Sequence, residues 1–417
     1  MSIAYPKIKL KHCATLNMGQ SPSSEDINRD QMGLPFIQGC AEFGEKYPSP
    51  INFCESPRKT AKAGDILISV RAPVGEMNFA CTNVGIGRGI CAVSERIRVS
   101  DRGYLFHSIE ASKQVLLSVS TGSTYDAVST DDLGALEIYF PPLPIQRAIA
   151  SFLDKETSRI DALISKKERQ IELLQEKRQA IITRAVTKGL DPSAKMKDSG
   201  LEWIGEIPSK WEIVSIKRVL RKADYGISDN LYGEGDIPVL RMGNISNGVI
   251  DLTDLRFIDN VDKSLYLTPG DLLYNRTNSL AMIAKVGLFV GSDKYDKISF
   301  ASYLVRLRPN NRTTSKFLSY LLNVSGVIDE ARAIAYPSIN QVNLSPTRYL
   351  TIKIPLPPLT EQETIVDQLI RVDHQTNQMS DLIRKSLALL QEYRSSLITA
   401  AVSGQIDVSK MRAKAPE

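Results

Sequence analysis

The chain is 417 residues long, with 42% hydrophobic and 24% charged residues and a formal net charge of +5 at pH 7. This length can bury several hydrophobic cores, so two to four domains are expected. No run of 18 or more apolar residues is present, and residues 1–11 lack the apolar segment and cleavage site of a secretory signal. The sequence therefore argues against membrane insertion and secretion and favours a cytoplasmic location. The mild positive charge fits a polyanionic partner but does not indicate one by itself.

The cysteine pattern argues against a metal site. All five cysteines fall in the first hundred residues, none is part of a C-x-x-C pair, and the chain has only three histidines. A structural zinc site usually needs closely paired ligands, and an odd number of cysteines does not suit a disulfide framework. Free thiols in a reducing compartment are expected at these positions: Cys13, Cys40, Cys54, Cys81 and Cys91.

Residues 1–140 predict a β-rich module with some helix. Gly64 and Asp65 form a turn signal, and the apolar run from Ile66 to Val70 that follows is typical of a buried strand. Residues 141–210 then predict a long helix followed by a connector. From Pro144 to about Lys188 the apolar residues recur mostly in steps of three, four and seven, which is typical of a coiled-coil helix. At about 1.5 Å per residue this helix is roughly 65 Å long.

Residues 211–356 predict a second module on the same framework. Gly270 and Asp271 precede an apolar strand that ends near Tyr274, as Gly64 and Asp65 do in the first module. Residues 357–417 predict a second long helix, from Thr360 to about Ser403, and a C-terminal tail. Glycines follow both helices, as expected at helix ends.

The two helical regions are an internal repeat. Residues 141–193 align with residues 357–409 at a constant shift of 216, without a gap, and 17 of the 53 positions are identical. Average composition would give roughly 3. Neither helix has a second apolar face, so we expect the two to pack on each other. The candidates for coiled-coil and partner contacts are the repeated pairs Gln146 and Gln362, Leu153 and Leu369, Leu174 and Leu390, and Arg178 and Arg394.

The order of these segments resembles a known family. The motif P-P-L-x-x-Q opens both helices, at residues 141–146 and 357–362, and the connector at residues 200–208 reads G-L-E-W-I-G-E-I-P. Over its whole length the chain is similar to the specificity subunit of type I restriction-modification enzymes. The resemblance implies an α+β fold with internal pseudo-two-fold symmetry, in which two long antiparallel helices form a coiled coil that separates two β-rich α/β target recognition domains.

The resemblance also implies a function without catalysis. Each module would recognise one half of a split, asymmetric site in double-stranded DNA, and the helices would set the spacing and bind two methyltransferase subunits. S-adenosylmethionine would bind to those subunits, and ATP and magnesium to separate restriction subunits, so no cofactor and no metal are expected on this chain. A helix of roughly 65 Å corresponds to at most about 19 base pairs. Modules that lean inward would bring the half-site centres closer, to about 10 base pairs.

Contacts with base edges need Arg, Lys, Asn, Gln or Ser on loops, and further Lys and Arg contact phosphates. In the first module the candidates that follow the Gly-Asp strand are Ser69 and Arg71. In the second module they are Asn275, Arg276, Thr277 and Asn278. A second set, equivalent at the constant shift, is Thr124 and Tyr125 with Asn340 and Gln341. Arg88 and Lys285 are candidate phosphate contacts. For any single residue, a plain turn remains the alternative.

Two functions from other classes stay open. A self-contained DNA amino-methyltransferase needs a [DN]-P-P-[YF] turn, whereas the Pro-Pro pairs here follow Phe140 and Leu356. The glycine cluster at residues 85–89 is a weak nucleotide-loop signal, and no G-x-x-x-x-G-K-[ST] motif is present. A coiled-coil scaffold with two protein-binding modules would explain the repeat but not the connector motif.

Overall fold

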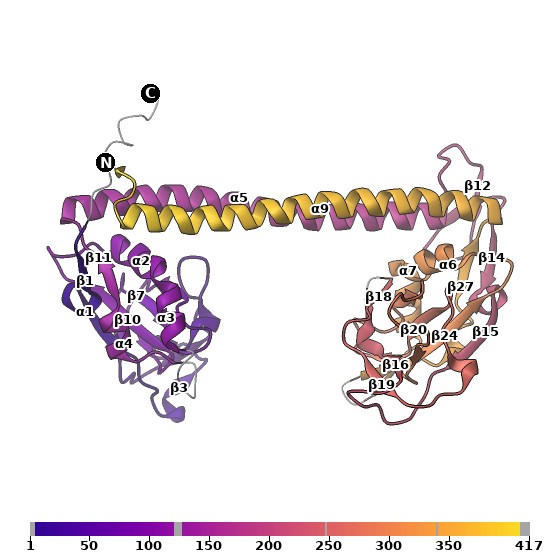
Figure 1. Ribbon diagram of the computed structural model, residues 1–417, viewed down its shortest axis with the longest axis horizontal. Coiled ribbons are helices and arrows are strands. Elements are labelled where there is room, and N and C mark those ends of the chain that lie inside the picture. Colours follow the sequence, from indigo (N-terminus) through magenta and orange to yellow (C-terminus); the bar gives the residue numbers. More distant parts are fainter. Residues whose placement is uncertain (1–4, 121–126, 247, 339–340, 409–417) are drawn as a thin grey trace. The chain divides into compact units, whose positions relative to one another are not determined.

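The computed structural model describes residues 5–120, 127–246, 248–338 and 341–408 (Figure 1). The chain forms two compact units. The first contains residues 1–169 and 383–417, and the second contains residues 170–382. Each unit therefore holds one globular module together with a part of each long helix. No helix within the described ranges is both long and apolar enough to cross a membrane.

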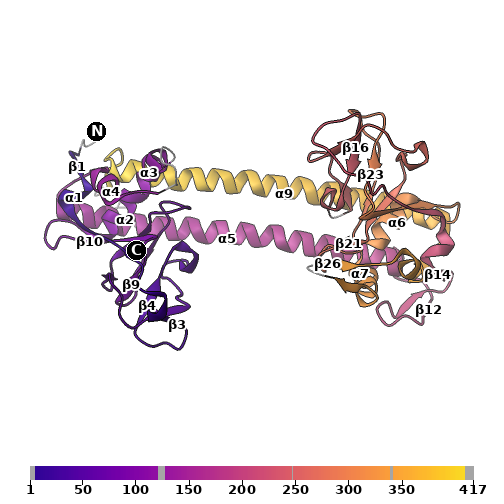
Figure 2. The same cartoon turned by 90° about the horizontal axis from the view of Figure 1, so that it is seen from below.

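The first module is built from two main sheets and four short helices. One sheet has the order β2-β10-β7-β8, the other has the order β3-β5-β4-β9-β6, and β1 pairs with β11. Figure 2 shows β3, β4 and β9 together in one lobe, apart from α2 and α4. The strands are β1 (Lys7–Lys9), β2 (Ala14–Met18), β3 (Ile27–Asn28), β4 (Leu34–Ile37), β5 (Asn52–Cys54), β6 (Thr60–Ala61), β7 (Ile66–Ser69), β8 (Met77–Phe79), β9 (Val84–Ile86), β10 (Ile90–Glu95) and β11 (Glu137–Tyr139). The helices are α1 (Leu10–Cys13), α2 (Arg102–Ala111), α3 (Lys113–Ser120) and α4 (Thr130–Ala135).

The second module repeats the central sheet of the first. Its order β15-β24-β20-β22 corresponds to β2-β10-β7-β8, and a further sheet has the order β19-β16-β23. Figure 2 shows β16 and β23 in one lobe and β21, β26 and α7 in the other. The strands are β14 (Glu212–Ser215), β15 (Leu220–Tyr225), β16 (Ile237–Leu240), β17 (Ile245–Ser246), β18 (Val249–Ile250), β19 (Arg256–Ile258), β20 (Leu272–Asn275), β21 (Thr277–Asn278), β22 (Val286–Leu288), β23 (Ser299–Phe300), β24 (Leu304–Pro309), β25 (Tyr336–Ser338), β26 (Gln341–Asn343) and β27 (Lys353–Leu356). The helices are α6 (Ser315–Leu322), α7 (Ser325–Ala333) and α8 (Pro346–Tyr349).

The Gly-Asp turns precede the same central strand in both modules. Gly64 and Gly270 have φ values of +91° and +98°, a conformation that only glycine adopts without strain. All four residues of β7 and all four of β20 are buried. A strand that is buried on both faces is continuously apolar rather than alternating, which explains the runs seen in the sequence.

The two predicted long helices are confirmed. They are α5 (Leu143–Lys188), with 46 residues, and α9 (Leu359–Val402), with 44 residues. In the first unit, Leu153 of α5 packs in one cluster with Ile398 and Ala401 of α9. Further along α5, Asp161 pairs with Arg394, which lies earlier on α9. The residue numbers therefore run in opposite directions, and the helices are antiparallel.

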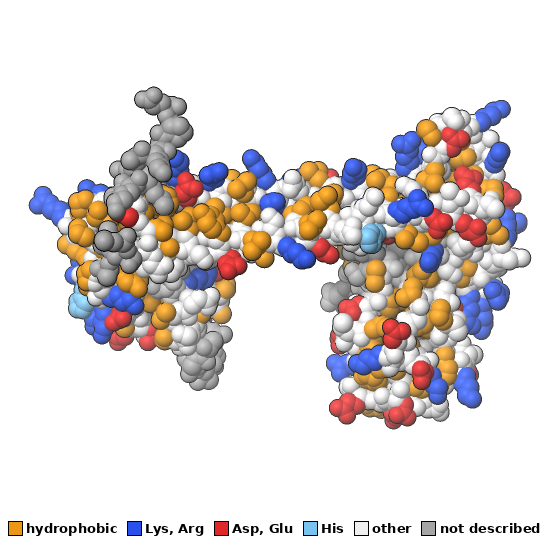
Figure 3. All heavy atoms as spheres, turned by 45° about the horizontal axis from the view of Figure 1, so that its top comes forward, with side chains coloured by type: hydrophobic (Ala, Val, Ile, Leu, Met, Phe, Trp, Pro, Cys, Tyr) orange, Lys and Arg blue, Asp and Glu red, His pale blue; other side chains and the backbone are white. Residues whose placement is uncertain are grey.

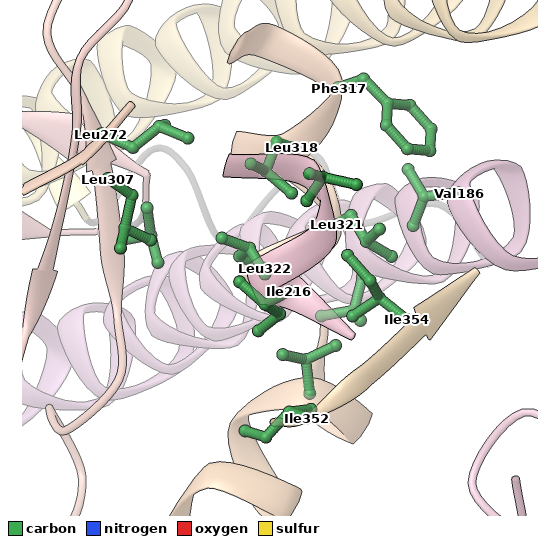
Figure 4. Close-up of a cluster of buried hydrophobic side chains, with 14 of the residues drawn as sticks. Val186, Ile216, Leu272, Leu307, Phe317, Leu318, Leu321, Leu322, Ile352 and Ile354 are labelled. Atoms are coloured by element: carbon green, nitrogen blue, oxygen red, sulfur yellow. The ribbon is translucent and has the colours of Figure 1, made fainter. Parts of the chain in front are cut away.

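The connector is part of the second unit rather than an independent linker. After α5, the short strands β12 (Met196–Asp198) and β13 (Glu206–Pro208) form a hairpin. A Cβ atom added to Gly326 at the start of α7 would lie 2.0 Å from the ring of Trp203, so the indole packs directly on the helix backbone. The indole N–H of the buried Trp211 donates to Glu361 on α9 over 2.9 Å. Figure 4 shows the core that this segment joins, with Val186 of α5 near Phe317 and Leu321 of α6.

Candidate nucleic-acid interface

The central strand of the second module ends in a small polar ribbon. Strand β21 follows β20 after one residue and pairs with β26, and β26 in turn pairs with β25. This ladder brings three sequence candidates, Thr277, Asn278 and Gln341, into one sheet, although Gln341 lies more than 60 residues after the other two. We call β21, β26 and β25 the ribbon.

Side chains on the ribbon fix one another. The hydroxyl of Thr277 donates to Oδ1 of Asn343 over 2.6 Å, which orients the amide. Tyr336 on β25 pairs with Asn343 on β26. The guanidinium of Arg348 lies over the ring of Tyr336, with its carbon 4.0 Å from the ring centre. Nη1 of Arg348 donates to the carbonyl of Ile334 over 3.3 Å. The ribbon thus presents amides, an exposed ring and a stacked arginine, which are the groups that proteins use on nucleic acids.

Arg276 lies between β20 and the ribbon. Its guanidinium stands 5.3 Å from the ring centre of Tyr225, and Nη1 donates to the carbonyl of Ser302 over 3.3 Å. Among the described residues, no carboxylate pairs with Arg276 or with Arg348. Two nearby arginines on β24 differ in this respect, because Arg306 pairs with Asp224 and Arg308 with Asp271. An arginine without a carboxylate partner is available to an anionic or base-edge ligand.

The first module has the same backbone arrangement at this place. The N–H of Val70 donates to the carbonyl of Gly89, and the N–H of Val128 donates to the carbonyl of Val70. The equivalent bonds in the second module run from Arg276 to Tyr303 and from Leu344 to Arg276. Arg71 pairs with Ala127 as Thr277 pairs with Asn343. We call this region, where the central strand ends, the strand-end site of each module.

Two sequence candidates, Ser69 and Asn275, are buried. Ser69 is 1% exposed, and its hydroxyl donates to the carbonyl of Pro73 over 2.6 Å and accepts from the N–H of Glu76 over 2.9 Å. Asn275, at the equivalent strand position, is completely buried, and its amide atoms have no partner among the described residues. These side chains lie inside the modules, because both strands are buried on both faces.

The other candidates differ in exposure. Arg71 and Arg88 are exposed, and Arg276, Asn278, Lys285 and Gln341 are partly exposed. Thr277 is 6% exposed, and its hydroxyl donates to Asn343. Thr124, Tyr125 and Asn340 lie outside the described residues. Sequence reasoning missed Tyr225, Tyr303, Tyr336, Asn343 and Arg348, whose only signal was an aromatic or basic residue near a strand end.

The repeated glutamines join each module to its helix. Gln146 accepts from the N–H of Asp101 over 2.9 Å and donates to the carbonyl of Pro141 over 2.8 Å. Gln362 accepts from the N–H of Thr314 and donates to the carbonyl of Pro357. Both side chains are completely buried, so they hold the helix starts within the chain and leave no surface for a partner. The shared hydrogen bonds explain why the motif P-P-L-x-x-Q occurs twice.

Charged groups also link the modules to the helices, with different chemistry in each unit. In the first unit, Arg394 of α9 pairs with Asp161 of α5 and with Glu110 of α2. In the second unit, Arg178 pairs with Asp373 over 2.7 Å, and the hydroxyl of Tyr320 on α6 donates to the same carboxylate over 2.6 Å. The two repeated arginines therefore occupy equivalent positions but are neutralised by different partners.

His107 adds a titratable group to the first junction. Its Nε2 lies 2.8 Å from Asp154 on α5, and its Nδ1 lies 3.6 Å from Glu110. Burial lowers the pKa of His107, but the two carboxylates outweigh this effect and the pKa is raised above its ordinary value. Burial likewise raises the pKa of Glu110, but His107 and Arg394 outweigh it and the pKa is lowered.

Exposed apolar residues recur at equivalent helix positions. Leu163 and Met379, related by the shift of 216, are 40% and 50% exposed, and Leu173 and Leu389 are 47% and 65% exposed. Figure 3 shows hydrophobic side chains at the surface along the helices. Leu153 and Leu369 are completely buried, whereas Leu174 and Leu390 are partly buried. Leu153 and Leu369 lie in packed clusters, and each unit carries two of the four exposed residues.

A duplicated fold with one strand-end site per module defines a class of two-module sequence-recognition protein. The chain belongs to the family described as the type I restriction modification DNA specificity domain, whose model matches residues 5–173 and 208–387. Among the described residues, no cluster of three or more His, Cys, Asp and Glu side chains is arranged to hold a metal ion.

Individual relatives agree with this family. The chain is 36% identical over 170 residues to the putative type I restriction enzyme MjaX specificity subunit of Methanocaldococcus jannaschii, which covers 41% of this chain and 39% of that protein. It is 25% identical over 331 residues to the MjaVIII specificity subunit of the same organism, covering 76% of this chain and 73% of that protein. A solved structure described as showing complex assembly and conformational transition of the type I R-M system has the same fold, with a TM-score of 0.73 and 16% identity over 97% of this chain and 98% of that chain.

Proposed function

We propose that this chain is the DNA specificity subunit of a type I restriction-modification complex and recognises a bipartite, asymmetric DNA site. The observation that carries the proposal is the strand-end site, which has the same backbone hydrogen bonds in both modules but different side chains. A shared frame places two recognition surfaces in the same way, and different side chains give each surface a different half-site.

The proposed partners are two methyltransferase subunits and separate restriction subunits. The repeated exposed pairs on α5 and α9 support two copies of one methyltransferase partner, because each unit carries one residue from each pair. Leu163 and Leu389 belong to the first unit, and Leu173 and Met379 belong to the second. S-adenosylmethionine would bind to the methyltransferase subunits, and ATP and magnesium to the restriction subunits. A non-catalytic role and a cytoplasmic location stay predictions.

The test is single-molecule sequencing of methylated bases in DNA from cells that express this chain with and without its candidate methyltransferase. Methylation at a split adenine motif only when both are present is the expected result. Methylation by this chain alone would show that it is an enzyme. No methylation, together with binding of the methyltransferase but not of DNA, would favour a protein scaffold.

A second experiment tests the helices as the spacing element. Insertion of four residues at matched positions of α5 and α9 should lengthen the spacer, by about 6 Å for a straight helix, while both half-sites stay the same. Exchange of residues 1–140 for another such module should change one half-site only. Altered half-sites after the helix insertion would contradict the proposal.

The docking surface has its own test. Replacement of Leu163 and Leu389 by serine should weaken binding of one methyltransferase copy, and replacement of Leu173 and Met379 should weaken the other. Replacement of all four should abolish the complex, as measured by native mass spectrometry. A single bound copy in the unaltered complex would contradict the proposed stoichiometry.

A further inference from the structure

The strand-end sites of the two modules differ at three equivalent positions. Ser69 and Asn275 are the last residues of the equivalent strands β7 and β20. Their partners on the neighbouring strands, Ile90 on β10 and Leu304 on β24, are therefore equivalent as well. The equivalent pairs are then Met18 and Tyr225, Val70 and Arg276, and Gly89 and Tyr303. Met18, Val70 and Gly89 of the first module are thus replaced by two tyrosines and an arginine in the second.

The alignment is supported by the backbone around it. Met18 and Tyr225 are each followed by a glycine at which an added Cβ would lie 2.2 Å from a neighbouring carbonyl oxygen. At the ends of β2 and β15, the backbone therefore approaches a neighbouring segment equally closely. The side chains at these positions differ in exposure. Val70 of the first module is 3% exposed, whereas Tyr225 and Tyr303 of the second module are 52% and 48% exposed. The second module presents large side chains at positions where the first presents little.

The guanidinium of Arg276 is held in one orientation. Its Nε is buried and has no partner in the described part of the chain, its face lies over the ring of Tyr225, and Nη1 donates to Ser302. The Nε edge of the guanidinium therefore faces the protein. Nη2 and the second hydrogen of Nη1 have no partner among the described residues, so two N–H donors stay available. A planar edge with two parallel N–H donors matches O6 and N7 of guanine in the major groove.

We propose that Arg276 recognises a guanine in one half of the DNA site, and that Tyr225 positions its guanidinium for this contact. The inference rests on the proposed function, since it assigns a residue to one base pair of the site recognised by the second module. Asn343 lies beside this arginine, because it pairs with Thr277 in the ladder, and Gln341 lies two residues before it on β26. Both amides contact the adjacent bases. The first module, with Val70 at the same position, has no such contact.

The fixed orientation of the Arg276 guanidinium favours a base rather than a phosphate as its ligand. A phosphate is satisfied by a mobile point charge such as a lysine, whereas a guanine edge requires a donor pair in a set plane. Arg276 is partly buried, stacked and hydrogen-bonded, and it has no carboxylate partner among the described residues. Arg348 is exposed on its tyrosine and is better suited to a phosphate.

The test is the methylated motif produced by variants of this chain in cells that also express the methyltransferase. With Arg276→Gln, methylation at the original motif should fall about 5- to 150-fold, and one G·C position in one half-site should become degenerate or change to A·T. Arg276→Lys should also lose the specificity for G·C at that position, because lysine keeps the charge but not the planar pair of N–H donors. Tyr225→Phe should keep the motif, and Tyr225→Leu should lower the rate about two- to fivefold.

Arg312→Gln is the matched control, because it removes the same charge from the same unit at an arginine paired with Glu212. It should leave the motif unchanged. If Arg276→Gln slows methylation of all sites alike and Arg276→Lys restores it, Arg276 contacts a phosphate and the proposal is wrong. An unchanged motif in both Arg276 variants would also overturn it. If the unaltered chain directs no methylation, it is the proposed function that fails. Should the glutamine variant not fold, the lysine variant carries the same test.

Discussion

The two modules share a backbone framework and differ in the side chains that it carries. Their central sheets have the same strand order, their Gly-Asp turns have the same backbone conformation, and each is joined to its helix by one buried glutamine. At the strand-end sites, at the helix junctions and inside the sheet, however, the side chains differ. Backbone hydrogen bonds constrain the frame regardless of side chain, so recognition surfaces can diverge without loss of the fold.

The interior shows the largest chemical difference. Arg306 on β24 is completely buried, and the equivalent position on β10 in the first module is Ala92. Arg306 donates to the carboxylate of Asp224 over 2.6 Å and to the carbonyls of Ser264 and Tyr266. The second module therefore depends on a buried charge that the first does not have.

Removal of this charge should have the largest effect on stability. Arg306→Met should destabilise the chain by about 3–5 kcal/mol, because two carbonyl groups lose their donor and Asp224 keeps only its pair with Lys222. Chemical unfolding followed by circular dichroism measures the effect. Arg312→Met, at a surface pair, should cost about 1 kcal/mol or less. Equal losses of unfolding free energy for the two variants would show that the buried pair contributes no more to stability than the surface pair.

The glutamine junctions test what the modules share. Gln362→Leu should cost about 2–4 kcal/mol, since it leaves buried backbone groups without partners. Gln146→Leu should cost somewhat less, because Gln362 also accepts from the hydroxyl of Thr313, whereas the second donor bond of Gln146, to Val99, is long at 3.4 Å. The two unfolding free energies provide the comparison. A negligible cost for either would contradict a junction role.

The connector distinguishes the second unit from the first. Gly326→Ala should destabilise by about 1–3 kcal/mol because the methyl group overlaps the ring of Trp203. In a helix without such a neighbour, alanine would stabilise by up to about 1 kcal/mol. Trp203→Leu in the same chain should restore tolerance of the alanine. Additive costs in the double variant, measured by thermal unfolding, would show that the two residues do not interact.

The smallest expected effect is a pH dependence confined to the first junction. Because the pKa of His107 is raised in the folded chain, its stabilising contribution is complete below its unfolded value of about 6.5 and is lost as the pH rises through the higher folded value. The thermal midpoint should therefore fall as the pH is raised through this range. His107→Gln should flatten that part of the profile, while Tyr320→Phe in the second unit should not. An unchanged slope in the glutamine variant would contradict this assignment.

Much of the architecture could be predicted from the sequence. The long helices follow from apolar spacing without Gly or Pro, and their starts and ends differ by at most one residue from those predicted. The central strands follow from a glycine turn before a continuous apolar run. These features are local, because spacing along the chain determines which face of a helix or strand can be buried.

The candidate site was predicted less well. The position of the strand ends was evident, and Arg276, Asn278 and Gln341 lie there. The direction of each side chain was not, so Ser69 and Asn275 were named although both are buried. Tyr225, Tyr303 and Arg348 were missed because each comes from a different segment, and only the tertiary structure brings these segments together.

The sequence by itself determined the duplication, the two helices and the family, because repeats, periodicity and motifs are properties of the order of residues. Only the tertiary structure decided which polar residues are internal braces and which face outward. Gln146 and Arg276 illustrate the reason. Both are polar residues beside an apolar segment, but the first is surrounded by backbone groups that satisfy its amide, whereas the second has a tyrosine beneath it and no carboxylate partner among the described residues.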